Sequence, residues 1–299
     1  MLFIITRFII INTHELVQML EPVIVKVKHA VLEKYIAYYY FLTTESDDFE
    51  AKYYAFPHTY TVLNIHCHAA HEINKYQTSV EGVSSFSPVS IVQGLREHPI
   101  LILLKGKLNK VTILFKPMGI NAFIPEPFGQ LIQQPSQEFS VWNNNRIYQQ
   151  FLSDFFTTGD LKAKATLLED FLLSMLKPVP DSKKLDLSIN LLSDFEQNLT
   201  LEDICDQLDV HPRTFNRLFK KHLGITPAGY RKVARFRHSL QNKLLENQVK
   251  QMTDLAYQSN YYDQSYFNKI YKSLTGTNPG RFFKQIETLA DNRLVFQFL

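Results

Sequence analysis

The sequence predicts an α+β chain: a β-rich N-terminal domain closed by helices, then an all-α domain of two helix-turn-helix units joined by a linker helix. Three observations predict it. Short runs of Val, Ile, Tyr, Phe and Thr, broken by Gly, Pro and Asn, fill residues 22–127. Apolar residues recur at helical spacing from residue 144 onward. The sequence pattern of one short helix, with the glycine that ends it, occurs at 216–227 and again at 268–279.

The strand candidates of the first region share a β-type composition and end at turn-forming residues. They are PVIVKVKHAV, YTVLNIHCH, SPVSIVQGL, PILILLKGKL and KVTILFKPMG. Many short strands without long helices favour a sandwich or a small barrel that extends to about residue 135. We expect the aromatic run YIAYYYF, at 35–41, in the core or an interface, with the lining of a ligand pocket as the alternative.

Helices are predicted at about 144–177, where RIYQQFLSDFF and LKAKATLLEDFLLSMLK carry an apolar stripe. The stripe is wider than one sheet face needs, so we expect Leu168 and Leu172 to form a two-fold contact, which makes a homodimer a predicted partner. The segment KPVPDSKK, at 177–184, is a polar linker with two prolines, and we expect few contacts between the parts it joins.

These boundaries divide the chain into three parts. Residues 1–180 form a predicted sensory and dimerisation domain, and residues 185–287 form the helical domain. Residues 288–299 are a tail whose role no pattern assigns.

Each copy of the repeated pattern follows a short amphipathic helix. In the first copy, Thr200 and a carboxylate three residues later come close to a capping box, Pro212 suits the first position of the second helix, and Gly224 ends it. In the second copy, Asp263 caps QSYFNKIYKSLT and Gly276 ends it. A short helix, a tight turn and a second helix make a helix-turn-helix.

The phase of the second helices separates an apolar side from a polar side. At 100° per residue, Phe215 and Phe219 face inward in the first copy, as do Phe267 and Tyr271 in the second. The polar sides offer donors for phosphates and guanine, and amides for adenine, with no carboxylate beyond the cap. A single such helix is equally well explained as a solvated face, but matched polarity in two copies favours DNA. The predicted DNA-binding residues are Arg213, Asn216, Arg217, Lys220, Gln264, Ser265, Asn268, Lys269 and Lys272.

Charge is distributed unevenly along the 299 residues, whose net charge is +3. Residues 1–196 hold 17 basic and 20 acidic side chains, a net charge of −3. Residues 197–287 hold 14 basic and 8 acidic side chains, a net charge of +6. This asymmetry is expected when one end of a protein meets a polyanion.

Cysteine usage and hydropathy indicate the compartment. The two cysteines, Cys67 and Cys205, exclude a disulfide framework and fit a reducing cytosol. The N-terminal apolar run is too short to span a bilayer, and Arg7 interrupts it. We therefore expect a cytoplasmic protein with no membrane partner.

Two helix-turn-helix units joined by one longer helix resemble the DNA-binding domain of AraC/XylS-family bacterial transcription regulators, over about residues 187–284. The most specific stretch is LAYQSNYYDQSYFNKIYKSLTGTNPGRFF, and GITPAGYRKVARFR matches the start of the linker helix. Asn260 replaces the usual Gly, and His211 stands where the first unit often has a Ser cap. Neither departure breaks the geometry, but we expect His211 to weaken the start of its helix. The resemblance implies transcription control, with double-stranded DNA and RNA polymerase as partners and with no catalysis or cofactor.

The N-terminal region resembles the cupin-like sensory domain of the same family more loosely. The resemblance rests on the strand pattern and on the turn FKPMGINAFI, at 115–124. It implies a jelly-roll barrel that responds to a small-molecule effector.

One cluster suggests metal binding. In HCHAAHE, His66 and His68 are two residues apart and share a face if they lie on one strand, and Glu72 follows. They form half of a metal-cupin motif, but no His follows Gly119 to complete it, so we predict no metal. The rival hypothesis is a metal-dependent cupin enzyme, with these three residues as ligands, fused to a DNA-binding domain. A ligand-independent dimeric regulator is a third possibility.

Overall fold

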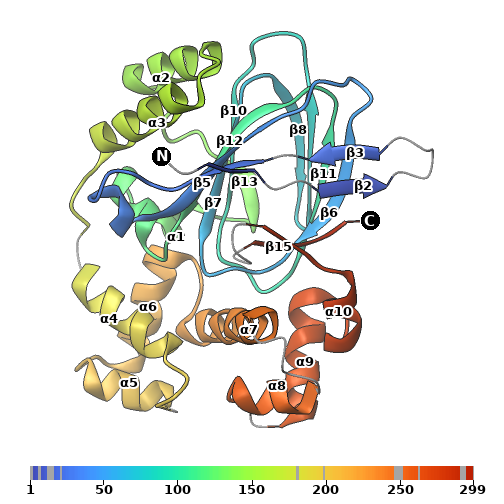
Figure 1. Cartoon of the computed structure of the whole chain (residues 1–299). Helices are drawn as coiled ribbons and strands as arrows, with labels where there is room; N and C mark the ends of the chain where they lie inside the picture. The colour runs from blue at the N-terminus through green and yellow to red at the C-terminus, as the bar shows by residue number, and fades with distance from the viewer. Residues whose placement is uncertain are drawn as a thin grey trace.

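A computed structural model describes residues 3–5, 8–11, 17–20, 22–179, 182–197, 199–245, 252–261, 263–289 and 294–298. Figure 1 shows a β-rich part above a group of helices. The strands are β1 (Phe3–Ile5), β2 (Phe8–Ile11), β3 (Val17–Leu20), β4 (Val23–Val25), β5 (Ile36–Thr43), β6 (Glu50–Ala55), β7 (Thr61–His66), β8 (Ala69–Asn74), β9 (Gln77–Gly82), β10 (Val89–Gln93), β11 (Ile100–Lys105), β12 (Asn109–Phe115), β13 (Ser136–Glu138), β14 (Glu287–Leu289) and β15 (Leu294–Phe298).

The helices are likewise short, apart from the linker helix. They are η1 (Leu32–Lys34), η2 (Gly119–Phe123), α1 (Phe128–Leu131), α2 (Arg146–Thr157), α3 (Leu161–Met175), α4 (Ser182–Ser193), α5 (Leu201–Gln207), α6 (Pro212–Leu223), α7 (Pro227–Leu245), α8 (Met252–Gln258), α9 (Gln264–Thr275) and α10 (Pro279–Gln285). The α+β class is confirmed.

Two sheets form the β-rich part. One has the order β1-β4-β5-β12-β7-β10-β13, and the other has the order β14-β15-β6-β11-β9-β8. Among the described strands, β2 and β3 make a separate ribbon, and the pairing of β9 with β11 is parallel while the other strand pairings are antiparallel.

Alternate side chains of β5 contribute to two different hydrophobic clusters, one on each face of the sheet. Tyr38 and Tyr40 belong to a cluster that joins the two sheets and includes Ile102 of β11. Tyr39 and Phe41 belong to a second cluster, with α2 and α3. Successive side chains of a strand point to opposite faces, so the aromatic run is core on both sides.

Among the described residues, the strands of the expected barrel do not close into one continuous sheet. The two sheets remain separate, because no described strand of one pairs with a strand of the other. Closure depends on which distant strands become neighbours, and the local composition of a strand does not encode that choice.

Helices α2 and α3 pack on the outer face of the seven-stranded sheet (Figure 1). Asn145 and Asp160 cap them through side-chain oxygens that accept hydrogen bonds from the first turn. Leu168 and Leu172 are each 0% exposed within the cluster beneath. The predicted two-fold contact is therefore wrong for these two residues, which belong to the core of the single chain.

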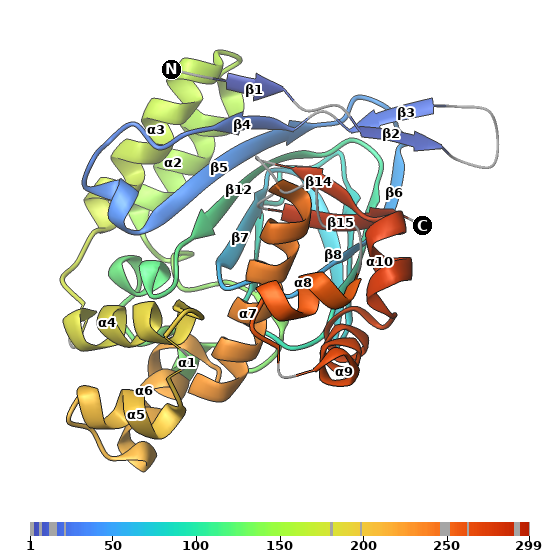
Figure 2. The ribbon, with the colours of Figure 1, turned by 60° about the horizontal axis from the view of Figure 1, so that its bottom comes forward.

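The C-terminal helices form two groups joined by α7. Figure 2 shows α7 running between α4–α6 on one side and α8–α10 on the other. After α10 the chain returns to the β-rich part, where β15 pairs with β6 in the register Phe296 to Ala55 and Phe298 to Tyr53. The tail that no sequence pattern assigned thus extends a sheet of the N-terminal domain.

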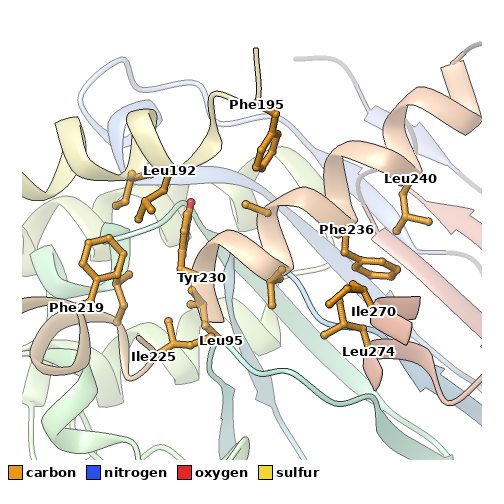
Figure 3. Close-up of a cluster of buried hydrophobic side chains, with 14 of the residues drawn as sticks. Leu95, Leu192, Phe195, Phe219, Ile225, Tyr230, Phe236, Leu240, Ile270 and Leu274 are labelled. Carbon is orange, nitrogen blue, oxygen red and sulfur yellow. The ribbon is translucent and has the colours of Figure 1, made fainter. Parts of the chain in front are cut away.

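Contacts between the N-terminal and helical parts are numerous, contrary to expectation. Phe56, Leu95 and Met118 belong to the same hydrophobic cluster as the helical core (Figure 3 shows Leu95 among the helices). The rings of Phe56 and Phe282 meet edge to face with centroids 4.8 Å apart. The composition of the polar linker did not indicate these contacts, because the residues that make them lie elsewhere in the chain.

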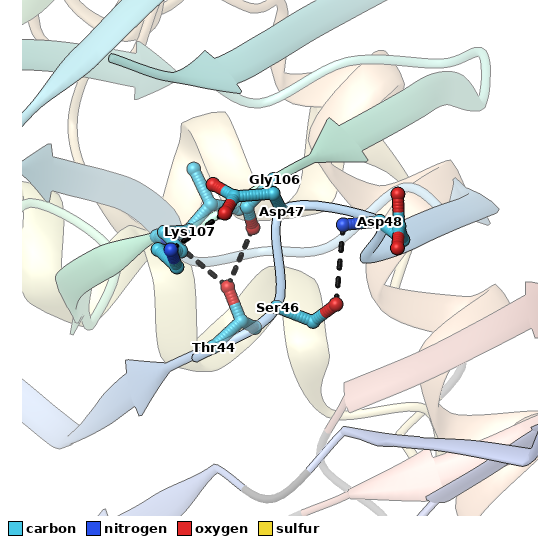
Figure 4. A network of polar contacts seen from close by, with 7 residues as sticks. Thr44, Ser46, Asp47, Asp48, Gly106 and Lys107 are labelled. Carbon is cyan, nitrogen blue, oxygen red and sulfur yellow. Dashed lines mark hydrogen bonds and ion pairs between the residues drawn. The ribbon is translucent and has the colours of Figure 1, made fainter. Parts of the chain in front are cut away.

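A polar network fixes the turns at one end of the sheets (Figure 4). The Thr44 hydroxyl donates to the carbonyl of Gly106 at 2.7 Å and accepts from the amide of Leu108 at 2.8 Å. Beside it, Lys107 Nζ lies 2.6 Å from the Asp47 carboxylate. These bonds join the end of β5 to the turn between β11 and β12.

Candidate nucleic-acid interface

The first helix-turn-helix unit consists of α5 and α6. Thr200 and Asp203 form a capping box at the start of α5. Asp209 takes a positive φ of 47° in the turn. The ring nitrogen Nδ1 of His211 accepts a hydrogen bond from the amide of Arg213 at 3.2 Å. The histidine therefore caps α6 in place of a serine, contrary to the expected weak start of this helix.

Helix α6 presents a polar face to solvent and an apolar face to the core. Phe215 and Phe219 are buried, and their rings meet at 5.0 Å. The predicted DNA-binding residues of this unit, Arg213, Asn216, Arg217 and Lys220, are all exposed. The Asn216 amide donates back to the carbonyl of Pro212 at 3.0 Å, so it would have to exchange this bond for one to a base.

The second unit repeats the arrangement with α8 and α9. The Asp263 carboxylate accepts from the amide of Tyr266 at 2.7 Å, and Gly276 ends the helix at φ 81°. The non-glycine Asn260 adopts a φ of 54°, the left-handed geometry expected for the turn. The five residues predicted to bind DNA in this unit are exposed: Gln264, Ser265, Asn268, Lys269 and Lys272.

The metal candidates do not converge. His66 ends β7 and is 2% exposed, whereas His68 lies in the following turn, where its Nδ1 contacts the carbonyl of Ser85 at 2.9 Å. Glu72 is exposed on β8. The described part of the chain holds no group of three His, Cys, Asp or Glu that could bind a metal ion. The two histidines do not share a strand face because the strand ends between them.

A buried polar cluster that sequence reasoning missed lies between the two sheets. Lys110 is 4% exposed, and its Nζ donates to Oδ1 of Asn64 at 3.1 Å and lies 5.6 Å from the centre of the Tyr40 ring. The Thr112 hydroxyl donates to the same Asn64 oxygen at 2.8 Å. Alternation along β12 carried the only signal, because it places Lys110 and Thr112 on the face opposite Val111.

The ammonium of Lys110 in this cluster is not paired with a carboxylate of the described residues. Among the described residues, no carboxylate lies within ion-pair distance of Lys110, and burial lowers the pKa of its ammonium to about 8. Beside it, burial holds the pKa of His66 well below its usual value, with the charge of Lys110 as a second cause. His66 Nδ1 has no hydrogen-bond partner among the described residues.

No described helix is both long enough and apolar enough to cross a membrane. Residues 204–285 match the family model of a helix-turn-helix domain, and the family is of the AraC type. The chain therefore contains an AraC-type helix-turn-helix domain. The resemblance noted in the sequence is thereby confirmed, and α5–α10 are the elements of its AraC-type domain. Residues 29–136 match a second model, a domain of unknown function.

Two curated relatives from Bacillus subtilis are similar to about a third of this chain. The uncharacterized HTH-type transcriptional regulator YtdP is 30% identical over 92 residues, which are 31% of this chain and 12% of YtdP. The bifunctional transcriptional activator/DNA repair enzyme AdaA is 32% identical over 105 residues, which are 35% of this chain and 49% of AdaA. The chain thus spans less than half the length of either relative.

Solved structures of ToxT from Vibrio cholerae are similar to most of the chain. One match covers 82% of this chain and 97% of ToxT, with a TM-score of 0.45 and 15% identity. A structure of ToxT bound to an unsaturated fatty acid matches with a TM-score of 0.43 and 15% identity, covering 81% of this chain and 94% of that one. Likeness at this distance transfers neither a ligand nor a residue role.

The AraC-type domain also shares a hollow with the N-terminal domain, which sequence reasoning missed. The hollow has a volume of about 630 Å³ and is lined by residues of two helices. From α6 come Arg213, Thr214, Asn216, Arg217, Lys220 and Lys221, and from α1 come Gly129 and Gln130. Nothing in the sequence indicated that α1 would lie beside α6.

Proposed function

We propose that the chain is a sequence-specific DNA-binding transcription regulator. The observation that carries the proposal is the matched exposure of two carboxylate-free polar faces, one on α6 and one on α9. Arginine and asparagine on a recognition helix offer bidentate donors to guanine and adenine edges, and lysine offers a charge to phosphate. The +6 charge of residues 197–287 supplies the sequence-independent attraction.

Within this proposal the exposed residues divide by role. Arg217 and Asn216 read bases in one groove, and Lys269, Asn268 and Gln264 read bases in the next. Lys220 and Lys272 lie toward the C-terminal ends of α6 and α9 and contact phosphates, whereas Arg213 and Ser265 lie in the first turns of these helices. RNA polymerase and a second copy of the chain complete the proposed partners, and the proposed compartment is the cytoplasm.

The test is selection of DNA from a random duplex library by the purified full chain, followed by sequencing. A regulator of this kind enriches one defined site, with a dissociation constant about 10³-fold or more below that for the starting pool at physiological salt. The matched control is the double variant Arg217→Ala, Lys269→Ala, which should enrich nothing. If the wild-type chain enriches no sequence, the proposal of sequence-specific binding is wrong.

We further propose that the N-terminal domain binds a small anionic effector between its two sheets. The supporting observation is the buried ammonium of Lys110 beside Asn64 and Thr112, without a carboxylate among the described residues within reach. An uncompensated buried charge is costly, and an incoming carboxylate or phosphate would offset that cost. His66 Nδ1 offers a further unused hydrogen-bonding position.

This second proposal is tested with a panel of small organic acids and their uncharged amides. The acid that binds should raise the melting temperature of the wild-type chain, and its amide should not. The variant Lys110→Met should lose that response. An equal response in the variant would place the ligand elsewhere.

A further inference from the structure

The hollow between α6 and α1 is strongly basic. Four of its lining residues are cationic, namely Arg213, Arg217, Lys220 and Lys221, and none of its lining residues is acidic. Gln130 completes the wall from the N-terminal domain, and its side chain is exposed. A hollow with four cations and an amide donor suits phosphate oxygens.

The position of α1 beside this hollow is set by backbone contact. A Cβ atom added at Gly129 would lie 1.9 Å from the carbonyl oxygen of Lys220 and 2.6 Å from the amide nitrogen of Gly224. Only glycine permits this approach, because any other residue would overlap main-chain atoms of α6. Asn121 adds a hydrogen bond from its amide to the carbonyl of His222 at 3.0 Å. Gln130 is thus held next to the recognition helix.

A recognition helix enters the major groove with its N-terminal residues, and the flanking phosphates pass along its sides and its far end. In α6, Arg213 and Arg217 belong to the first half of the helix, and Lys220 and Lys221 to its last turn. The phosphates that Lys220 and Lys221 attract would therefore lie over the hollow that α6 and α1 line.

We infer that α1 is part of the DNA-binding surface: the side-chain amide of Gln130 donates to a backbone phosphate held by Lys220 and Lys221. The N-terminal domain then contacts DNA directly, in addition to its proposed role in binding an effector. This inference rests on the proposed function, since it requires α6 to bind duplex DNA.

The experiment compares the full-length variants Gln130→Glu and Gln134→Glu with the wild-type chain. Both variants lower the net charge by one at exposed positions, and Gln134 lies outside the hollow. The probe is a random-sequence 30-base-pair duplex titrated at several salt concentrations, because phosphate contacts do not depend on sequence. Gln130→Glu should weaken binding about tenfold relative to Gln134→Glu, because it loses a donor and places a carboxylate beside a phosphate.

The possible outcomes test the role of Gln130 separately from DNA binding by the whole chain. Equal affinities of the two variants would remove Gln130 from the interface. Tighter binding by Gln130→Glu would mean that α1 obstructs DNA rather than contacting it, and this too would overturn the inference. Failure of the wild-type chain to bind the duplex at low salt would instead reject the proposed function itself.

Discussion

The side chain of Asn121 connects the beginning of α1 to the end of α6. Its Nδ2 donates to the carbonyl of His222 at 3.0 Å, and its Oδ1 accepts from the amide of Phe128 at 2.9 Å. The last carbonyls of a helix have no partner within the helix, so Asn121 supplies one from another domain. One buried amide therefore orders α1 and docks it on the recognition helix.

Replacement of this asparagine by aspartate should loosen the docking. Asn121→Asp keeps the acceptor for Phe128 but removes the donor to His222 and sets a carboxylate against a carbonyl oxygen. We expect the free energy of unfolding to fall by about 1–3 kcal/mol, the cost of a buried hydrogen bond left unmade. Urea denaturation measures it, with the exposed Asn144→Asp as the control. A similar loss in both variants would contradict the role given to Asn121.

The helix-turn-helix units could be predicted from the sequence because their determinants are local. The caps Thr200 and Asp263, and the left-handed glycines Gly224 and Gly276, act within a few residues of the helices they bound. The 3.6-residue period then assigned the buried and exposed faces. The docking of α1 on α6 cannot be predicted in this way, because the two helices are far apart in sequence.

The arrangement of the sheets depends on pairings between distant residues, which local patterns do not contain. The pairing of Phe296 with Ala55 joins the C-terminal tail to β6, which is far away in sequence, and both strands have ordinary strand patterns. The burial of Lys110 was missed for a related reason. Its neighbours Asn64 and Tyr40 come from β7 and β5, and neither strand is adjacent to β12 in sequence.

The tail should protect the edge of a sheet. A chain that stops after Ile286 loses β14 and β15 and leaves β6 with an open side. Exposed strand edges pair with other chains, so the truncated protein should self-associate at concentrations where the full chain does not. Sedimentation velocity over a concentration series measures this. Unchanged sedimentation after truncation would contradict the pairing of β15 with β6.

The buried ammonium should make stability depend on alkaline pH. Burial lowers the pKa of Lys110 to about 8, from 10.5. Between those values the unfolded chain binds a proton that the folded chain does not, so folding stability rises with pH in that window. The rise attributable to Lys110 should total about 3 kcal/mol.

The variant Lys110→Met isolates this contribution from the tyrosines that titrate in the same range. Below pH 8 the wild-type chain carries the full cost of the buried charge, so the variant should be the more stable of the two. Its advantage should shrink as the pH approaches 10.5. A difference between the two chains that stays constant from pH 7 to 10.5 would show that the Lys110 ammonium has its ordinary pKa in the folded chain.

The two recognition helices should occupy successive major grooves of one duplex. They follow each other head to tail on one chain, joined by the continuous helix α7, so they lack the two-fold relation of a dimer. We expect a separation of roughly 34 Å, one turn of DNA, and a non-palindromic site. Footprinting of a selected site measures the span. Protection of a single groove by one protomer would contradict the arrangement.

Substitutions on the two helices then separate base reading from phosphate binding. Arg217→Ala should cost about 1–3 kcal/mol at the selected site and relax the preference at one or two base pairs, because a bidentate contact to guanine is lost. Lys272→Ala should weaken binding to all sequences alike and reduce the salt slope by about one, because it removes one phosphate contact. Titrations of the selected and random duplexes at several salt concentrations measure both effects. The assignment fails if the two variants lose selected and random DNA in the same proportion, since Arg217 would then contact phosphate as Lys272 does.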